Sequence, residues 1–174
     1  LYLPCDFSSF ELMPSFMIFR CREEKYCSNS IILSFLDMPT ANPKPIAFFA
    51  YGTLKRNRSN HDLLAGSRFI GKAVTVRKYG FYLGPDEQSV EDSSIPYLFK
   101  EPRKGDQAVR VYGEVWEIDV LTLKQLDQFE GHPNWYQRAQ ISVNLDSGEN
   151  ISSTMYMMPG QPYSHLKVIT SGCF

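Results

Sequence analysis

Residues 44–54 read KPIAFFAYGTL, a nearly continuous apolar run that leads into a tight loop containing a glycine. A short run without polar alternation is typical of a strand that is buried on both faces. Loops that follow such strands often carry binding or catalytic groups on a rigid scaffold. The loop formed by Tyr51, Gly52, Thr53 and Leu54 is therefore our first candidate site.

The sequence after this loop predicts further strands separated by turns. We place them at residues 69–82 with a break at Gly80, 95–99, 109–118, 136–145 and 150–158. The strand at 109–118 alternates between two faces, and residues 146–149 are expected to form a hairpin turn. Six or seven strands with two short helices predict an α+β domain, built as a small mixed β-barrel with short flanking helices.

The two helices are indicated by the residues at their ends. The first begins after Ser59 or Asn60 as its cap and ends before Gly66. The second covers about residues 120–129 and begins after Asp119, whose side chain is a good N-cap.

The second helix places a carboxylate on its apolar side. Leu123, Leu126 and Glu130 share one stripe at spacings of three and four residues, with Phe129 beside it. Burial and the negative end of the helix dipole both raise the pKa of a carboxyl group at this position. A carboxyl group whose pKa approaches neutrality suits general acid–base catalysis. The alternative is that the helix end frays and Glu130 turns to solvent beside Gly131.

Residues 51–54 also have two interpretations. Gly52 lets the backbone turn and expose successive N–H groups, which can hold a small anion such as a substrate carboxylate. The alternative is an ordinary turn from a strand into a helix. No glycine pattern of a phosphate-binding loop occurs in the sequence, so nucleotide chemistry is not supported.

Other polar residues are weaker candidates. Glu114 shares a strand face with aromatic residues and is either a second acid or a structural carboxylate. Tyr136 and Arg138 either pair with Glu130 or only open the next strand. The three histidines lack metal-ligand spacing, so we expect no metal site.

The composition excludes several classes of protein. The 174 residues are 43% hydrophobic and 14% aromatic, which favours a sizeable core over disorder. Eighteen basic and nineteen acidic residues give a net charge of -1, which argues against a nucleic-acid surface or a polybasic membrane anchor. The longest apolar stretches fall far short of the roughly 18 residues that span a bilayer as a helix.

Residues 1–45 differ from the remainder of the chain, because they hold three of the four cysteines and no sustained helical or strand period. We interpret them as an N-terminal extension appended to a functional domain at 46–174. We expect the functional chain to begin near Met38, because residues 39–45 are typical of a linker or tail that leads into the first strand. The cysteine pattern favours reduced thiols in an intracellular protein, which we expect to be cytoplasmic. The alternative is a disulfide or redox pair between Cys21 and Cys27.

Several motifs occur together in order and at plausible spacing. They read YGTLKR at 51–56 followed by Asn60-His61, IPYL at 95–98, VYGEVW at 111–116, LDQFEG at 126–131 and YQR at 136–138. This set resembles the γ-glutamyl cyclotransferase-like family, and it is most similar to the γ-glutamylamine cyclotransferase branch. The resemblance covers about residues 46–158.

The resemblance implies a small mixed barrel in which Tyr51, Gly52, Thr53 and Leu54 bind the γ-glutamyl portion of a small-molecule substrate. It also implies that Glu130 is the catalytic acid/base. The implied reaction is the cyclisation of a γ-glutamylamine, such as γ-glutamyl-ε-lysine, to 5-oxoproline with release of the amine and without a cofactor. We expect the protein to act as a monomer.

Two other functions remain open from the sequence. The first is a related cyclotransferase that acts on glutathione or on γ-glutamyl amino acids. The second is a catalytically silent binding or assembly module on the same fold, with the extension as its docking element.

Overall fold

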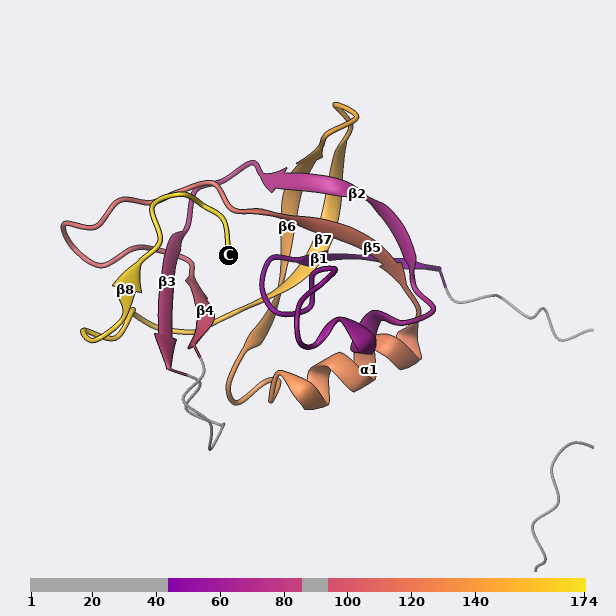
Figure 1. Cartoon of the computed structure of the whole chain (residues 1–174), viewed down its shortest axis with the longest axis horizontal. Helices are drawn as coiled ribbons and strands as arrows, with labels where there is room; N and C mark the ends of the chain where they lie inside the picture. Colours follow the sequence, from indigo (N-terminus) through magenta and orange to yellow (C-terminus); the bar gives the residue numbers. More distant parts are fainter. Residues whose placement is uncertain (1–43, 86–93) are drawn as a thin grey trace, which may run out of the picture. The chain divides into compact units, whose positions relative to one another are not determined.

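The computed structural model describes residues 44–85 and 94–174. Five strands form a closed barrel in the order β1 (Ile46–Ala50), β5 (Tyr112–Ile118), β2 (Arg68–Thr75), β6 (Gln137–Leu145) and β7 (Asn150–Met157) (Figure 1). Neighbouring strands are antiparallel except where β1 runs parallel to β7 and closes the barrel. The mixed barrel that we expected from the sequence is therefore confirmed.

A smaller sheet of three strands lies beside the barrel. Its order is β4 (Ser94–Phe99), β3 (Gly80–Pro85) and β8 (Lys167–Val168), all antiparallel. The sheet joins the barrel just beyond β7, where Phe99 forms a parallel bridge with Met158. This junction brings β4 next to the chain that leaves the barrel.

Two short helical segments occur among the described residues of the domain. The 3₁₀ segment η2 (His61–Leu64) follows the loop after β1, and the helix α1 (Val120–Phe129) follows β5. The predicted cap of α1 is confirmed, because the Thr122 N–H donates to the Asp119 carboxylate at 2.7 Å. Asn60 precedes η2 as expected, but its side chain makes no capping hydrogen bond.

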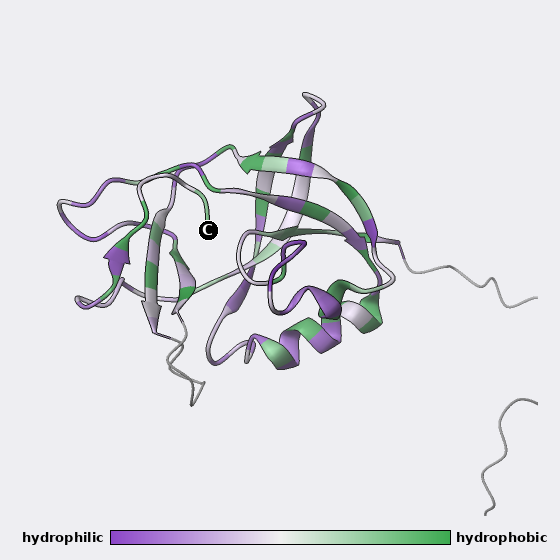
Figure 2. Cartoon of the chain, viewed as in Figure 1, coloured by the Kyte–Doolittle hydropathy of each residue, from purple (hydrophilic) through white to green (hydrophobic). Residues whose placement is uncertain are grey.

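The core has two parts, one on each side of the barrel wall. Inside the barrel, Phe49, Val115 and Met155 pack together. On the other side, Trp116 packs with Leu126 of α1 and with side chains from the small sheet. Adjacent residues of β5 thus contact different parts of the core, which confirms the predicted alternation. Figure 2 shows hydrophobic and hydrophilic residues interspersed along these strands and along α1.

Two strand predictions need correction. Residues 69–82 do not form one interrupted strand, because β2 belongs to the barrel and β3 to the small sheet. The break lies at residues 76–79, before Gly80. The strand predicted from residue 109 begins at Tyr112, and Val109 instead forms an isolated bridge with Tyr79. The pairing of distant segments decided these boundaries, and local alternation does not reveal such pairing.

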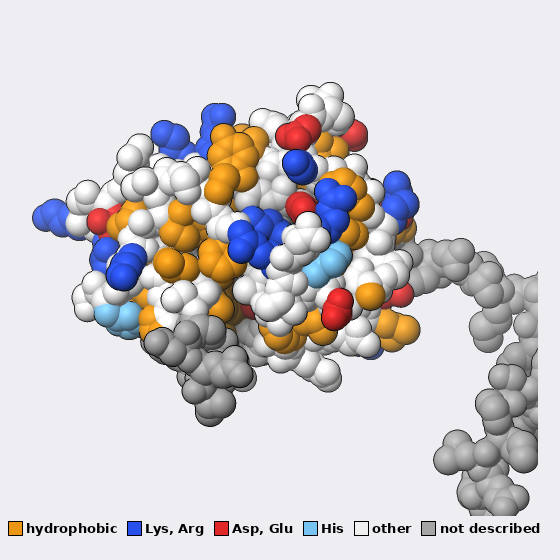
Figure 3. Space-filling view, in the orientation of Figure 1, with side chains coloured by type: hydrophobic (Ala, Val, Ile, Leu, Met, Phe, Trp, Pro, Cys, Tyr) orange, Lys and Arg blue, Asp and Glu red, His pale blue; other side chains and the backbone are white. Residues whose placement is uncertain are grey.

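The predicted N-terminal extension lies almost wholly outside the described residues, and so do Cys5, Cys21 and Cys27. Cys173 is described, and its thiol is free and exposed. In the described part of the chain, no helix has the length and apolar character needed to cross a membrane. Figure 3 shows basic and acidic side chains interspersed with hydrophobic ones on the displayed face.

Candidate active site

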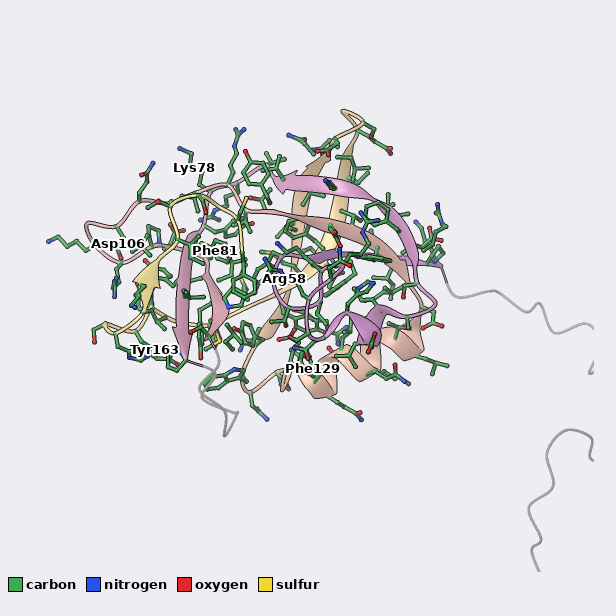
Figure 4. The ribbon with its side chains drawn as sticks, in the orientation of Figure 1. Arg58, Lys78, Phe81, Asp106, Phe129 and Tyr163 are labelled. Atoms are coloured by element: carbon green, nitrogen blue, oxygen red, sulfur yellow. The ribbon has the colours of Figure 1, made fainter. Side chains whose placement is uncertain are left out.

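A cavity of about 330 Å³ lies where the end of β1, the start of β4, the end of α1 and β7 approach one another. Its lining includes all five residues that the sequence singled out as a site, namely Tyr51, Gly52, Thr53, Leu54 and Glu130. The remaining lining residues are mostly apolar or aromatic. Figure 4 labels one of them, Phe129, at the C-terminal end of α1. The structure therefore brings together two motifs that are almost 80 residues apart.

The loop after β1 is held by its own backbone and by a close neighbour. The Lys55 N–H donates to the Gly52 carbonyl at 3.2 Å, and the Asn60 N–H donates to the Thr53 carbonyl at 3.1 Å. A Cβ atom on Gly52 would lie only 2.8 Å from Cγ of Pro96. Gly52 is therefore required by the close approach of Pro96, which forms part of the cavity wall.

Glu114 supports this loop from outside the cavity. Its carboxylate accepts hydrogen bonds from the Arg56 N–H at 2.9 Å and from the Arg56 Nε at 3.3 Å. The guanidinium group of Arg56 also lies 3.7 Å from the ring centroid of Phe69. Of the two interpretations of Glu114, the structural carboxylate is the one that this geometry favours.

Glu130 is half-buried at the end of α1. Its N–H donates to the Leu126 carbonyl at 2.9 Å, and its own carbonyl accepts from the Tyr136 N–H at 3.1 Å. Because both backbone groups are bonded, the frayed alternative does not describe this residue. Burial raises the pKa of Glu130 to about 7, and no ion pair within residues 44–85 and 94–174 offsets that effect.

The other predicted partners of Glu130 have different roles. Arg138 forms an ion pair with Asp127 at 3.1 Å, and Asp127 also accepts a hydrogen bond from the Tyr156 hydroxyl at 2.7 Å. Tyr136 contributes its side chain to the cavity wall, and its hydroxyl donates to the Pro96 carbonyl at 3.1 Å. The suggestion that Arg138 pairs with Glu130 is therefore wrong.

Tyr51 lines the cavity close enough to Glu130 for the two groups to interact electrostatically. Its hydroxyl donates to the Tyr156 carbonyl at 2.9 Å, deep in the structure. Burial raises the pKa of Tyr51 well above its ordinary value, and the charge of Glu130 raises it further. Tyr51 is therefore a neutral wall residue at physiological pH, and Glu130 is the group there whose charge can change.

Several lining residues were not identified as site residues from the sequence. They are Phe48, Phe49, Ala50, Asn60, Ile95, Pro96, Phe129, Trp135 and Tyr156, while Tyr136 was named only as a weaker candidate. Asn60, Ile95, Pro96 and Phe129 did occur in the motifs that carried the resemblance, so the spacing of those motifs was an available signal. Tyr156 lies in a strand with no such motif, and only the parallel pairing of β7 with β1 brings it to the cavity.

The histidines lie apart from one another. His61 places Nδ1 at 3.1 Å from the Leu54 carbonyl and its ring against Trp116, while His165 stacks on Tyr163. His132 lies near Tyr156, with ring centroids 6.3 Å apart. In the part of the chain that the structure describes, no three His, Cys, Asp or Glu side chains gather as metal ligands.

The sequence of the chain is similar to those of several named proteins. A protein of Methanocaldococcus jannaschii, provisionally named a gamma-glutamylcyclotransferase, is 38% identical over 112 residues, which are 64% of this chain and 82% of that protein. The gamma-glutamylaminecyclotransferase of Bos taurus is 36% identical over 103 residues, 56% of each chain. These names indicate a gamma-glutamyl cyclotransferase activity.

Solved structures agree with the sequence relatives. The crystal structure of an AIG2-like protein from Mus musculus superposes with a TM-score of 0.55 at 29% identity, covering 66% of this chain and 78% of that one. The family model described as "Gamma-glutamyl cyclotransferase, AIG2-like" matches residues 48–174, which include the whole cavity lining. The chain belongs to the gamma-glutamyl cyclotransferase, AIG2-like family.

Proposed function

We propose that this protein is a γ-glutamylamine cyclotransferase in which Glu130 is the catalytic acid/base. The loop formed by Tyr51, Gly52, Thr53 and Leu54 binds the γ-glutamyl portion of the substrate. The observation that carries the proposal is the position of Glu130 in the same cavity as this loop, with a pKa of about 7. A group with that pKa exchanges protons readily at physiological pH.

The reaction requires the α-nitrogen of the substrate to lose two protons and the leaving nitrogen to gain protons. The α-amino group of the substrate is an ammonium ion at neutral pH, so Glu130 first removes a proton and frees the lone pair. The nitrogen then attacks the γ-carbonyl carbon, and the C–N bond to the amine breaks as Glu130 returns the proton to the leaving nitrogen. The ring nitrogen gives up its second surplus proton, so the lactam keeps one N–H hydrogen and the expelled amine leaves as an ammonium ion. One carboxylate thus acts as base and then as acid, and the products are 5-oxoproline and the free amine.

The cavity also lowers the cost of bending the substrate. Closing a five-membered ring requires the flexible glutamyl chain to adopt one compact conformer. Walls supplied by rigid strands and by the end of α1 restrict that chain, and such orientation is worth several kcal/mol of barrier. Backbone N–H groups of residues 52–54 are suited to hold the substrate α-carboxylate.

The charge of the cavity supports an amine as the leaving group. No Lys, Arg or His occurs among the described residues that line it, and its one carboxylate belongs to Glu130. A γ-glutamyl amino acid carries a second carboxylate on the carbon next to the nitrogen that leaves, and glutathione carries one at the far end of its leaving dipeptide. Burying that charge near Glu130 without a cation is unfavourable. An ε-linked lysine instead places methylene groups at this point, which the apolar walls can contact.

The first test compares two identical chemical changes. Glu130→Gln keeps the shape of the side chain and removes its titratable proton, so we expect release of 5-oxoproline from γ-glutamyl-ε-lysine to be lost. Glu149→Gln makes the same change in the exposed turn between β6 and β7 and should leave turnover intact. Undiminished turnover by Glu130→Gln would reject the role of Glu130.

The second test concerns the leaving group. γ-Glutamylethylamine and γ-glutamyl-alanine differ only by the carboxylate on the leaving amine, so we expect the first to be turned over faster. Glutathione and γ-glutamyl-ε-lysine extend the comparison. Preference for γ-glutamyl-alanine or glutathione would favour the related cyclotransferase, and binding of the whole set without 5-oxoproline release would favour a silent binding module. The monomeric state and the cytoplasmic location stay predictions.

A further inference from the structure

Asn60 has a position that its predicted role does not explain. The sequence suggested it as a helix cap, yet its side chain makes no capping hydrogen bond to η2. The residue is partly buried and lines the cavity. A polar side chain at this place is available for a different interaction.

The other polar side chains of the cavity are largely occupied. Three tyrosine hydroxyls in the lining already donate hydrogen bonds to protein acceptors: Tyr51 to the Tyr156 carbonyl, Tyr136 to the Pro96 carbonyl and Tyr156 to Asp127. The amide group of Asn60 has no hydrogen-bond partner among the described residues. A primary amide carries two N–H donors, which makes Asn60 the richest side-chain donor left for a ligand.

The backbone fixes Asn60 against the loop that we assign to the γ-glutamyl group. Its N–H donates to the Thr53 carbonyl at 3.1 Å, and its own carbonyl accepts from the Leu63 N–H at 3.3 Å. The side chain therefore starts beside the turn whose N–H groups we assign to the α-carboxylate. Since no cation lines the described cavity, that carboxylate needs several neutral donors.

We infer that the side-chain amide of Asn60 is a substrate-binding group that donates a hydrogen bond to the α-carboxylate of the γ-glutamyl substrate. The inference rests on the proposed function and adds a residue to it. The loop N–H groups contact one carboxylate oxygen, and Nδ2 of Asn60 contacts the other. Asn60 thereby makes recognition depend on the carboxylate and not only on the five-membered ring.

Substitutions at Asn60 give distinct expectations. A hydrogen bond to a charged group is worth more than a neutral one, so Asn60→Ala should weaken carboxylate binding by roughly tenfold or more. Asn60→Asp keeps the shape but places a negative charge beside the ligand carboxylate, so it should weaken binding further. Asn57→Asp is the matched control, because Asn57 is exposed on the same loop, outside the cavity lining, and its φ of 63° suits Asp as well as Asn.

The experiment is calorimetric titration of the full chain with 5-oxoproline and with 2-pyrrolidinone, which is the same ring without the carboxylate. We expect Asn60→Ala and Asn60→Asp to lose affinity for 5-oxoproline while their affinity for 2-pyrrolidinone changes little, and Asn57→Asp to resemble the unmodified protein. Thermal unfolding of each variant shows whether it is folded. If Asn60→Ala does not fold, the isosteric Asn60→Asp provides the test.

Two failures are distinguishable in this design. If the unmodified protein binds 5-oxoproline and the Asn60 variants bind it equally well, the role of Asn60 is wrong and the proposed function is untouched. Equal losses of affinity for 5-oxoproline and for 2-pyrrolidinone would also overturn the role of Asn60, since they indicate a general change in the cavity. If the unmodified protein neither binds 5-oxoproline nor releases it from any γ-glutamyl compound, the proposed function itself fails.

Discussion

Tyr156 and Asp127 are joined by a hydrogen bond of 2.7 Å from the tyrosine hydroxyl to Oδ1 of the carboxylate. The same oxygen lies 3.1 Å from Nε of Arg138. Glu130 follows Asp127 by three residues on the same helix, but it has no cationic partner among the described residues. Two carboxylates at the C-terminal end of α1 therefore have opposite environments, as we expect if Asp127 is structural and Glu130 is the proposed acid/base.

Removal of Asp127 should destabilise the fold. Asp127→Ala leaves the largely buried Tyr156 hydroxyl without its acceptor, so we expect the free energy of unfolding to fall by about 1–3 kcal/mol. Urea denaturation measures the change. Asp62→Ala is the control, because Asp62 is exposed in η2, and there the expected loss is below about 0.5 kcal/mol. Equal losses at the two positions would contradict the assignment.

The pH dependence of turnover should follow Glu130. Since burial raises the pKa of Glu130 to about 7, the unprotonated base becomes the major form only above that pH. We expect kcat/KM for γ-glutamyl-ε-lysine to rise as the pH increases through 7 and then to level off. A rate that is flat from pH 5 to pH 8, or that falls over this range, would show that Glu130 is not the base.

The same pKa makes a prediction about stability. Glu130 titrates at about 7 in the folded protein and at 4.5 in the unfolded chain, so the folded state binds more protons between these values. The stability that the protonated group contributes is complete below pH 4.5 and is lost as the pH rises to 7. The loss amounts to at most about 3 kcal/mol.

Urea unfolding at pH 5 and pH 8 measures this effect. The free energy of unfolding of Glu130→Gln should fall less between the two pH values than that of the unmodified protein, because glutamine does not titrate. Glu149→Gln, in an exposed turn, should keep the full pH dependence. If Glu130→Gln also keeps the full pH dependence, the titration of Glu130 does not cause the loss of stability between pH 5 and pH 8.

The elements that sequence reasoning located best have local determinants. The Asp119 cap and the leucine stripe placed α1 at the observed residues, and the apolar run placed β1. The stripe also oriented Glu130 correctly, since helical spacing fixes which side chains share a face. Phe129 shows the limit of that argument, because it is 42% exposed although it lies beside the stripe.

What the sequence could not supply depends on contacts between distant segments. The break between β2 and β3 arises because the two strands enter different sheets, and the two-residue strand β8 exists only through its pairing with β3. Asn60 is similar, since helix propensity predicts a cap, and only the folded structure shows that its side chain makes no capping hydrogen bond and lines the cavity instead. Alternation within one segment contains no information about these pairings.

Gly52 should be intolerant of even one additional carbon. In Gly52→Ala the new Cβ would lie 2.8 Å from Cγ of Pro96, so the loop or the start of β4 must move, and both form the cavity wall. We expect a loss of about 1–3 kcal/mol in the free energy of unfolding together with a large loss of turnover. Gly71→Ala is the control, because the nearest atom to its Cβ, in Leu145, lies at an ordinary 3.6 Å. If the Gly52→Ala enzyme matches Gly71→Ala in 5-oxoproline release and in urea unfolding, the packing of Pro96 on Gly52 does not shape the site.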